Sequence, residues 1–494
     1  MANEAGRTVQ ETEQIATGVP GLDRLLNGGL RRGGLHVALG GPGAGKSVLA
    51  HQVGSHAVRG GGKVLYLTVL AETHQVLLSQ ARTFSFFDPA VVPGSFYYAS
   101  LYPALARGGL GAVREEIGRL VAQHGPTLVV LDGMHALKAA APSRLEHQRF
   151  MHEMEAQSNV AGVTTLILTH PEGEMSSDPT FTIADAIFHL RARDAGLRTV
   201  RLFKVEKLRG VGHVGGWHTF EITPDGVHLY PRLESLVRGW EKHVASGSPG
   251  SAPTEPLAGF DVDGLDDMMG GVLGRGTSTL VVGTPGSGKT LLGLAFLTAG
   301  ARTGERGLFL GFHEPPNSLL EKADGVGLPF RQGIEDGLIR IHWRTPAEMN
   351  ADAVAEEALA MAEEHGIKRL VIDAYEDTRR AVIPAKRTVA FHLALINLLR
   401  ERGITTLLLQ DLSQIVGLNF EMPAPEVTAT MENVLHIRYV EYRSQMRRLI
   451  TVLKVQARQH DHTLRDFHIT EKGMRVGKAF DKTDTALTGV VLDG

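Results

Sequence analysis

Two glycine-rich segments of this sequence have the residue types and the spacing of a phosphate-binding loop. They read GGPGAGKS at 40–47 and GTPGSGKT at 283–290, and both match the pattern G-x-x-x-x-G-K-[S/T]. Glycines let backbone N–H groups converge on phosphate oxygens, the lysine reaches the β- and γ-phosphates, and the final hydroxyl binds Mg²⁺. An apolar run precedes each segment and a helical pattern follows it, which is the context that the motif requires. The sequence therefore predicts two sites for a nucleotide with Mg²⁺.

The predicted nucleotide contacts lie in these loops and in the first turn of the helix that follows each of them. A chance glycine-rich turn is the alternative, and it would have to occur twice in one chain. The contacts are Gly41, Gly43, Ala44, Gly45, Lys46, Ser47 and Val48 in the first half, and Thr284, Gly286, Ser287, Gly288, Lys289, Thr290 and Leu291 in the second.

Two aspartates end apolar runs that read as buried strands, and they are the predicted partners of the loop hydroxyls. Asp132 follows the run 128–131, and Asp373 follows the run 370–372. Ligands bind at the carboxyl ends of parallel strands, so a carboxylate there can hold Mg²⁺ against the phosphates. The predicted metal ligands are therefore Ser47 with Asp132, and Thr290 with Asp373. The alternative role for each aspartate is to cap the loop after its strand.

Hydrolysis also needs a group that orients or deprotonates the attacking water. Glu72 and Glu314 follow the second apolar run of their halves, and the offset between them is 314 − 72 = 242. This offset keeps them in register with the repeated loops, so both are predicted catalytic residues. A solvated surface glutamate is the alternative interpretation of either residue alone.

The elements that must position these residues occur twice, because the chain is an internal duplication. The loop lysines are 289 − 46 = 243 residues apart, and the Gly-Leu-Asp steps before the loops are 264 − 21 = 243 residues apart. Continuous apolar strands alternate with helical patterns in each half, and alternating segments close it, at 186–191 and 433–438. The predicted fold class is α/β, with two tandem domains, each a mostly parallel sheet flanked by helices and ending in an antiparallel meander.

The predicted ranges are a tail at 1–13, a first domain at 14–240, a linker at 241–256, a second domain at 257–480 and a tail at 481–494. The linker contains a run rich in Gly, Pro and Ser at 246–254, which is typical of a flexible segment.

Composition excludes several classes of function. The 494 residues carry 51 Lys and Arg and 54 Asp and Glu, a net charge of −3, so no basic field favours nucleic acid. The sequence has no cysteine, no signal-peptide pattern and no apolar run long enough for a bilayer. We therefore expect a cytoplasmic protein without membrane contact and without a nucleic-acid partner.

The sequence resembles the KaiC family, which are double-domain ATPases of the RecA-like P-loop class. The resemblance covers residues 14 to about 480 and is carried by the Gly-Leu-Asp steps, both phosphate-binding loops, both aspartate strands and KLRG at 207–210. It implies a homohexameric ring of two tiers with ATP between neighbouring subunits, and slow hydrolysis. Clock members of the family also phosphorylate themselves on a Ser-Thr pair in the second domain.

The resemblance assigns further residues position by position. Lys207 and Arg209 match a pair that reaches the γ-phosphate bound by the neighbouring subunit. In the second domain Lys454 is kept, Gln456 stands in place of the arginine, and Arg458 is the candidate that could replace it.

Other positions depart from the family pattern. The family's two adjacent glutamates after the second strand read Ala71-Glu72 and His313-Glu314 here, so only the second glutamate of each pair is kept. The phosphorylated Ser-Thr pair falls on Thr428-Ala429, which leaves Thr428 as the phosphorylation candidate and implies weak or single-site autokinase activity.

The function predicted from the sequence is ATP binding and hydrolysis in a hexameric ring. Two alternatives remain at this point. One is a DNA-handling motor of the recombinase or helicase kind, because fold alone does not fix function. The other is a non-catalytic scaffold in which nucleotide holds the ring together and signals to a protein partner.

Overall fold

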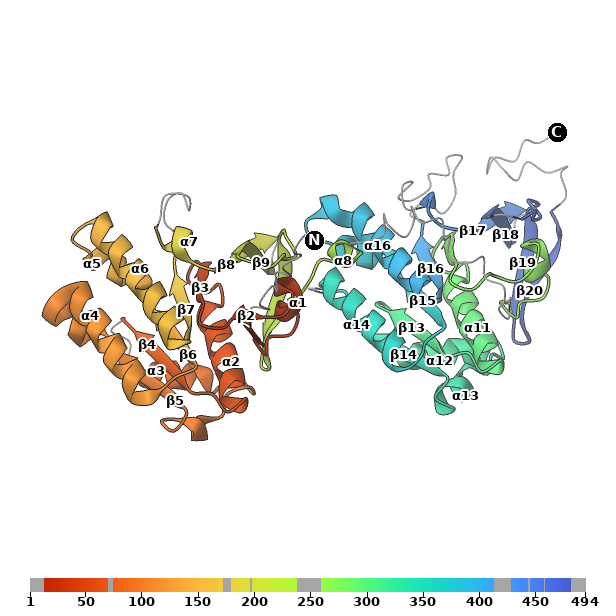
Figure 1. Cartoon of the computed structure of the whole chain (residues 1–494). Helices are drawn as coiled ribbons and strands as arrows, with labels where there is room; N and C mark the ends of the chain where they lie inside the picture. The colour runs from red at the N-terminus through yellow and green to blue at the C-terminus, as the bar shows by residue number, and fades with distance from the viewer. Residues whose placement is uncertain are drawn as a thin grey trace, which may run out of the picture. The chain divides into compact units, whose positions relative to one another are not determined.

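The computed structural model describes residues 13–69, 74–171, 179–195, 198–237, 259–347, 349–412, 428–442, 445–456 and 458–480. Contacts between residues divide the chain into two compact units, Met1–Arg232 and Leu233–Gly494. Figure 1 shows the helices and strands of both units in chain order.

The described part of the first domain is built on a sheet with the strand order β11-β10-β9-β8-β3-β7-β6-β4-β5. The strands from β8 to β5 in this order run parallel, whereas β8, β9, β10 and β11 form an antiparallel meander. The strands are β3 (Leu35–Gly40), β4 (Val64–Thr68), β5 (Phe96–Ser100), β6 (Leu128–Asp132), β7 (Thr164–Thr169), β8 (Ala186–Ala195), β9 (Arg198–Leu208), β10 (His218–Thr223) and β11 (Gly226–Tyr230). A separate pair, β1 (Gln14–Ile15) and β2 (Leu30–Arg31), precedes them.

Helices cover both faces of this sheet, because its central strands are apolar on both sides. In β3, Ala38 packs into one core with Leu49 and Val53 of α2, while Val37 and Leu39 pack into the other core with α4 and α6. Figure 1 shows α2 on one side of this sheet and α4 and α6 on the other. The helices are α1 (Leu22–Leu26), α2 (Lys46–Arg59), α3 (His74–Ala81), α4 (Tyr102–His124), α5 (Met134–Ala140), α6 (Arg144–Ala161) and α7 (Pro179–Ile183).

The second domain repeats this topology, with the strand order β14-β13-β15-β16-β12-β17-β18-β19-β20 among the described residues. Its central strand β12 lies between β16 and β17, as β3 lies between β7 and β8. The strands are β12 (Ser278–Gly283), β13 (Gly307–Gly311), β14 (Ile339–Trp343), β15 (Arg369–Asp373), β16 (Thr405–Asp411), β17 (Asn433–Tyr442), β18 (Gln445–Val455), β19 (Arg465–Thr470) and β20 (Gly473–Ala479).

Helices again cover both faces of the second sheet, with α11 on one face and α14 and α16 on the other. The helices are α10 (Leu265–Met268), α11 (Lys289–Arg302), α12 (Pro316–Gly325), α13 (Phe330–Glu335), α14 (Ala351–Glu364), α15 (Tyr375–Ala381) and α16 (Thr388–Glu401). The predicted fold class is therefore confirmed: both halves are parallel α/β sheets that end in antiparallel strands.

A short helix, α8 (Leu233–Leu236), belongs by its contacts to the second domain. Leu233 is buried in the core beside α14 and α16, and Arg387 donates two hydrogen bonds to Glu234, at 2.7 and 2.8 Å. The same guanidinium donates two more to Asp352, both at 2.9 Å. The predicted linker lies outside the described residues, and the predicted domain boundaries stay a prediction.

Candidate nucleotide-binding sites

Each phosphate-binding loop joins the carboxyl end of the central strand to the helix that follows it. The last loop glycines, Gly45 and Gly288, have φ angles of 99° and 101°, which favour glycine. A Cβ atom at Gly45 would lie 2.8 Å from Cδ1 of Ile222, and one at Gly288 would lie 2.4 Å from Cδ1 of Ile469. The backbone conformation thus requires glycine at these two positions, and a Cβ there would also displace an isoleucine side chain of the meander.

In the first site, Lys46 is held by the loop itself. Its Nζ donates to the carbonyl oxygens of Gly40 at 2.7 Å and Gly41 at 3.0 Å. Burial lowers the pKa of Lys46, and the negative charge of Asp132 opposes this shift. An ammonium group has three protons, so Lys46 has one more than these two bonds use; its contact with a phosphate stays a prediction.

Ser47 and Asp132 come together as the sequence predicts. Ser47 Oγ lies 3.5 Å from Oδ2 of Asp132, and the hydroxyl of Tyr66 donates to the same carboxylate oxygen at 2.8 Å. Burial and the neighbouring Asp132 raise the pKa of Tyr66 well above its usual range, so this hydroxyl stays a donor. Sequence reasoning missed Tyr66, because the tyrosine reads only as part of an apolar strand.

His170 stands beside the first lysine. Its Nδ1 lies 3.1 Å from the carbonyl oxygen of Gly40, which also accepts from Lys46. Burial and then the charge of Lys46 lower the pKa of His170, so the ring is neutral at pH 7.

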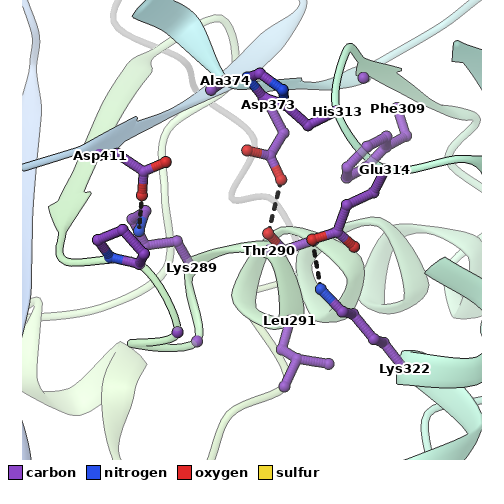
Figure 2. A pocket seen from close by; sticks show the side chains of 14 residues that line it. Lys289, Thr290, Leu291, Phe309, His313, Glu314, Lys322, Asp373, Ala374 and Asp411 are labelled. Atoms are coloured by element: carbon purple, nitrogen blue, oxygen red, sulfur yellow. Dashed lines mark hydrogen bonds and ion pairs between the residues drawn. The ribbon is translucent and has the colours of Figure 1, made fainter. Parts of the chain in front are cut away.

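The second site is a cavity of about 390 Å³ that contains most of the predicted residues of this half (Figure 2). Lys289 donates to the carbonyl oxygens of Gly283 at 3.0 Å and Thr284 at 2.9 Å, as Lys46 does in its own loop. It also forms an ion pair of 2.6 Å with Asp411, the last residue of β16. The cavity is lined by Pro285, Gly286, Gly288, Lys289, Thr290, Leu291, Phe309, Gly311, His313, Glu314, Lys322, Asp373, Ala374 and Asp411.

Thr290 and Asp373 form the second hydroxyl–carboxylate pair. Thr290 Oγ1 donates to Oδ2 of Asp373 at 2.7 Å (Figure 2). Burial raises the pKa of Asp373 to about 6; the hydrogen bond from Thr290 opposes the rise, and the charge of Glu314 adds to it.

Of the two predicted catalytic glutamates, Glu314 lies among the described residues. Glu314 lines the second cavity, and Lys322 of α12 forms an ion pair with its Oε1 (Figure 2). Glu72 lies outside the described residues, so its role stays a prediction. His313, which precedes Glu314, has its Nε2 2.7 Å from Oδ2 of Asp377.

Lys207 and Arg209 lie at the edge of the sheet opposite to the loop of their own domain. Lys207 pairs with Ile187, and the N–H of Arg209 donates to Asp185, whose own N–H donates to Leu35 at the start of β3. The phosphate-binding loop begins after Gly40, five residues further along β3, or about 16 Å at the usual strand rise. Neither side chain is brought to its own loop.

Both side chains are held by carbonyl oxygens at the end of α7. Lys207 Nζ donates to Phe181 at 3.0 Å and to Thr182 at 2.8 Å, and Arg209 donates to Thr182 at 2.7 Å. In the second domain Lys454 donates to the carbonyl of Ala429 at 2.9 Å. Arg458 is not brought to the loop of its own domain; its guanidinium lies against Gly271, where a Cβ would be 3.2 Å from Nη1. Thr428, the phosphorylation candidate, is buried.

Comparison with known proteins accounts for both halves of the chain. A family described as "ATPase: KaiC" matches residues 15–234 and again residues 260–480. The chain belongs to the KaiC family. The circadian clock oscillator protein KaiC of Picosynechococcus sp. is 24% identical over 494 residues, which cover 97% of this chain and 93% of that protein. The circadian clock protein KaiC3 of Synechocystis sp. is 25% identical over 503 residues, covering 97% and 95%.

The donor sets in both KaiC-family domains fit Mg²⁺ held together with a nucleotide. Each site pairs one hydroxyl with one carboxylate, and oxygen ligands are what this ion prefers. The described residues contain no group of three or more His, Cys, Asp or Glu side chains that could hold a metal by themselves.

Besides Tyr66, four residues of the two sites were not predicted from the sequence. They are His170, Lys322, Asp377 and Asp411. Each touches a predicted site residue or its neighbour, but comes from another element of the fold.

Among the described residues, no helix combines the length and the hydropathy needed to cross a bilayer.

Proposed function

We propose that the chain binds ATP with Mg²⁺ in both KaiC-family domains and hydrolyses it mainly in the first. The pairing of each loop hydroxyl with its strand-end aspartate carries this proposal, because it brings a hydroxyl and a carboxylate together beside the loop lysine in both domains. Ser47 with Asp132 and Thr290 with Asp373 would hold Mg²⁺, and the ion would neutralise phosphate charge when bound. Lys46 and Lys289 neutralise the phosphate oxygens, and Asp132 and Asp373 orient the loop hydroxyls.

The position of Lys207 and Arg209 supports a ring with the sites at its subunit boundaries. They lie at the far edge of their own sheet, so only a neighbouring copy could bring them to a γ-phosphate. We propose a homohexamer assembled around ATP. Native mass measurement with saturating ATP at micromolar protein tests it: a six-subunit species is expected, and a monomer under these conditions would contradict the ring.

The division of labour between the domains rests on what surrounds each candidate base. Glu314 is in an ion pair with Lys322, whereas the aligned position in the first half is Gln80 (322 − 242 = 80). The trans arginine is present as Arg209 and replaced by Gln456 in the second domain. The rate of phosphate release should therefore fall to a small fraction in Glu72→Gln and stay largely intact in Glu314→Gln. The reverse result would place the activity in the second domain.

Autophosphorylation, if the chain retains it, is proposed to be confined to one site. Thr428 is 7% exposed, and the neighbouring Ala429 has no hydroxyl to accept a phosphate. Intact mass after incubation with ATP should show at most one phosphate per chain, and none in Thr428→Ala. Two phosphates that accumulate in order would contradict this proposal.

A second candidate function for the second domain is a nucleotide-gated scaffold that signals to a protein partner. The ion pairs that occupy Lys289 and Glu314 favour it, because both groups must exchange partners when nucleotide binds. An ATP-dependent change in hydrogen exchange of α12, without phosphate release from this domain, would support the scaffold over the enzyme.

A further inference from the structure

We infer that His313, oriented by Asp377, is the proton acceptor for the attacking water in the second domain. The inference rests on the proposed ATP hydrolysis and assigns the weak second-domain reaction to a residue other than Glu314.

The position of His313 at the cavity is the first observation. It follows β13 by two residues and lines the cavity together with Lys289, Thr290 and Asp373 (Figure 2). Its side chain is 60% exposed, so one side of the imidazole is open to water. A base must reach the attacking water within hydrogen-bond distance, and a cavity-lining side chain can do so.

The second observation is the carboxylate that holds the ring. Oδ2 of Asp377 lies 2.7 Å from Nε2 of His313, and the Asp377 side chain is only 9% exposed. Asp377 lies on α15, four residues after the metal-binding Asp373, so the same strand end positions both carboxylates. The 2.7 Å contact places this carboxylate against Nε2, so a ring that carries its proton on Nε2 keeps Nδ1 as an acceptor, as in a base oriented by a third group.

The third observation is that the competing acceptor is engaged. Lys322 occupies Oε1 of Glu314, so a proton arriving at this oxygen would have to displace an ammonium group. Oε2 of Glu314 has no hydrogen-bond partner among the described residues. Glu314 is therefore the rival that the experiment has to separate from His313.

The duplication provides an internal comparison. The residue aligned with His313 is Ala71, next to Glu72, and the residue aligned with Asp377 is Ala136, since 377 − 241 = 136 and 373 − 241 = 132. Both members of the pair are present in the second domain and both are alanine in the first. This is the pattern expected of two side chains that act as one unit.

The proposed step is a simple hydrolysis. The water oxygen attacks the γ-phosphorus while the bond from this phosphorus to the β–γ bridging oxygen breaks, and ADP leaves with the bond's electron pair. Nδ1 of His313 takes the proton from the water, Asp377 stabilises the resulting imidazolium, and the proton then passes to solvent. No electron is exchanged.

The test uses the full-length chain with Glu72→Gln, so that the remaining phosphate release reports the second domain. Adding His313→Gln should lower this release by about 10²-fold, the usual contribution of a general base. Binding of a fluorescent ATP analogue should stay unchanged, and added imidazole should restore part of the release. Asp377→Asn should lower release about tenfold and Asp377→Glu should recover part of it, as expected of a positioning residue.

His342→Gln is the matched control, because His342 also contacts a carboxylate, Glu357 at 3.1 Å, but does not line the cavity. It should leave phosphate release unchanged. Unchanged release in His313→Gln together with a loss in Glu314→Gln would overturn the inference, and so would a Glu72→Gln chain that releases no more phosphate than Glu72→Gln/Lys289→Ala. Absence of hydrolysis in the unmodified chain would instead refute the proposed function.

Discussion

The two phosphate sites of this chain share their loops but differ in the residue that faces the loop lysine. His170 follows β7 in the first domain, and Asp411 is the aligned residue at the end of β16 in the second. The first lysine therefore meets a neutral ring, whereas the second is ion-paired at 2.6 Å. The two loops thus have the same phosphate-binding pattern, but the neighbouring side chains differ. At the second loop a phosphate must compete with Asp411 for Lys289.

The same contrast extends to the aspartates. Tyr66 donates to Asp132 in the first domain, but the aligned residue in the second is Phe309, since 66 + 243 = 309. Asp373 accepts a hydrogen bond from the hydroxyl of Thr290 and has no tyrosine hydroxyl beside it at the aligned position, and burial raises its pKa to about 6. This difference supports the proposal that the first site holds Mg²⁺ more tightly and hydrolyses most of the ATP.

The largest effect is expected from the trans arginine. Arg209→Ala should lower steady-state phosphate release by about 10³-fold or more, because such an arginine stabilises the charge of the transferring group. Gln456→Ala should change release little, and Gln456→Arg should raise it in the Glu72→Gln chain. An Arg209→Ala chain that keeps half of its activity would break the comparison.

Acid should affect the second domain through buried His392, at a position where the first domain has a methionine. His392 packs on Tyr375 at 4.5 Å between ring centroids, and the aligned residues of the first domain are Met151 and Met134 (392 − 241 = 151; 375 − 241 = 134). Burial lowers the pKa of His392 from 6.5 to about 4. Its contribution to stability is therefore fully present above pH 6.5 and is lost as the pH falls toward 4.

Between pH 7 and pH 5, protonation of this histidine in the unfolded state should lower the free energy of unfolding of the second domain by about 2 kcal/mol. His392→Met should remove that loss, measured as hydrogen exchange in β16 at both pH values. His365→Met, at a less buried histidine, serves as the control. Equal acid sensitivity in all three chains would show that His392 is not the group that titrates.

Removing the tyrosine hydroxyl should weaken the first site. Tyr66→Phe deletes a hydrogen bond to a carboxylate, so the Mg²⁺ concentration needed for half-maximal ATP binding should rise about tenfold. The reciprocal change, Phe309→Tyr, should lower this concentration at the second site. An unchanged Mg²⁺ dependence in Tyr66→Phe would mean that Ser47 alone orients Asp132.

The smallest effect is expected from the ion pair at the second lysine. Asp411 is half exposed, so its bond to Lys289 is a weak competitor for phosphate. Asp411→Asn should tighten ATP binding at the second site about threefold by titration calorimetry. The swap His170→Asp should weaken the first site by a similar factor; tighter binding there would contradict the argument.

Much of the fold and part of each site were predictable from the sequence, for a physical reason. Strand periodicity and loop glycines are local signals, so both sheets, Lys46, Lys289 and the strand-end aspartates could be predicted. Asp377, Asp411 and Lys322 could not, because each meets its partner only after distant elements pack together. No local pattern distinguishes such residues from ordinary surface charges.

The contacts of α8 determine where the two halves of this chain could be separated or exchanged. A fragment that starts at residue 257 lacks Leu233 and Glu234. It therefore loses a buried side chain of the core and the two hydrogen bonds from Arg387 to Glu234. Fragments for expression should instead be divided between Arg232 and Leu233. In a chimaera with another first domain, the foreign segment should end before the position of Leu233. The helix α8 would then stay with α14 and α16, against which it packs.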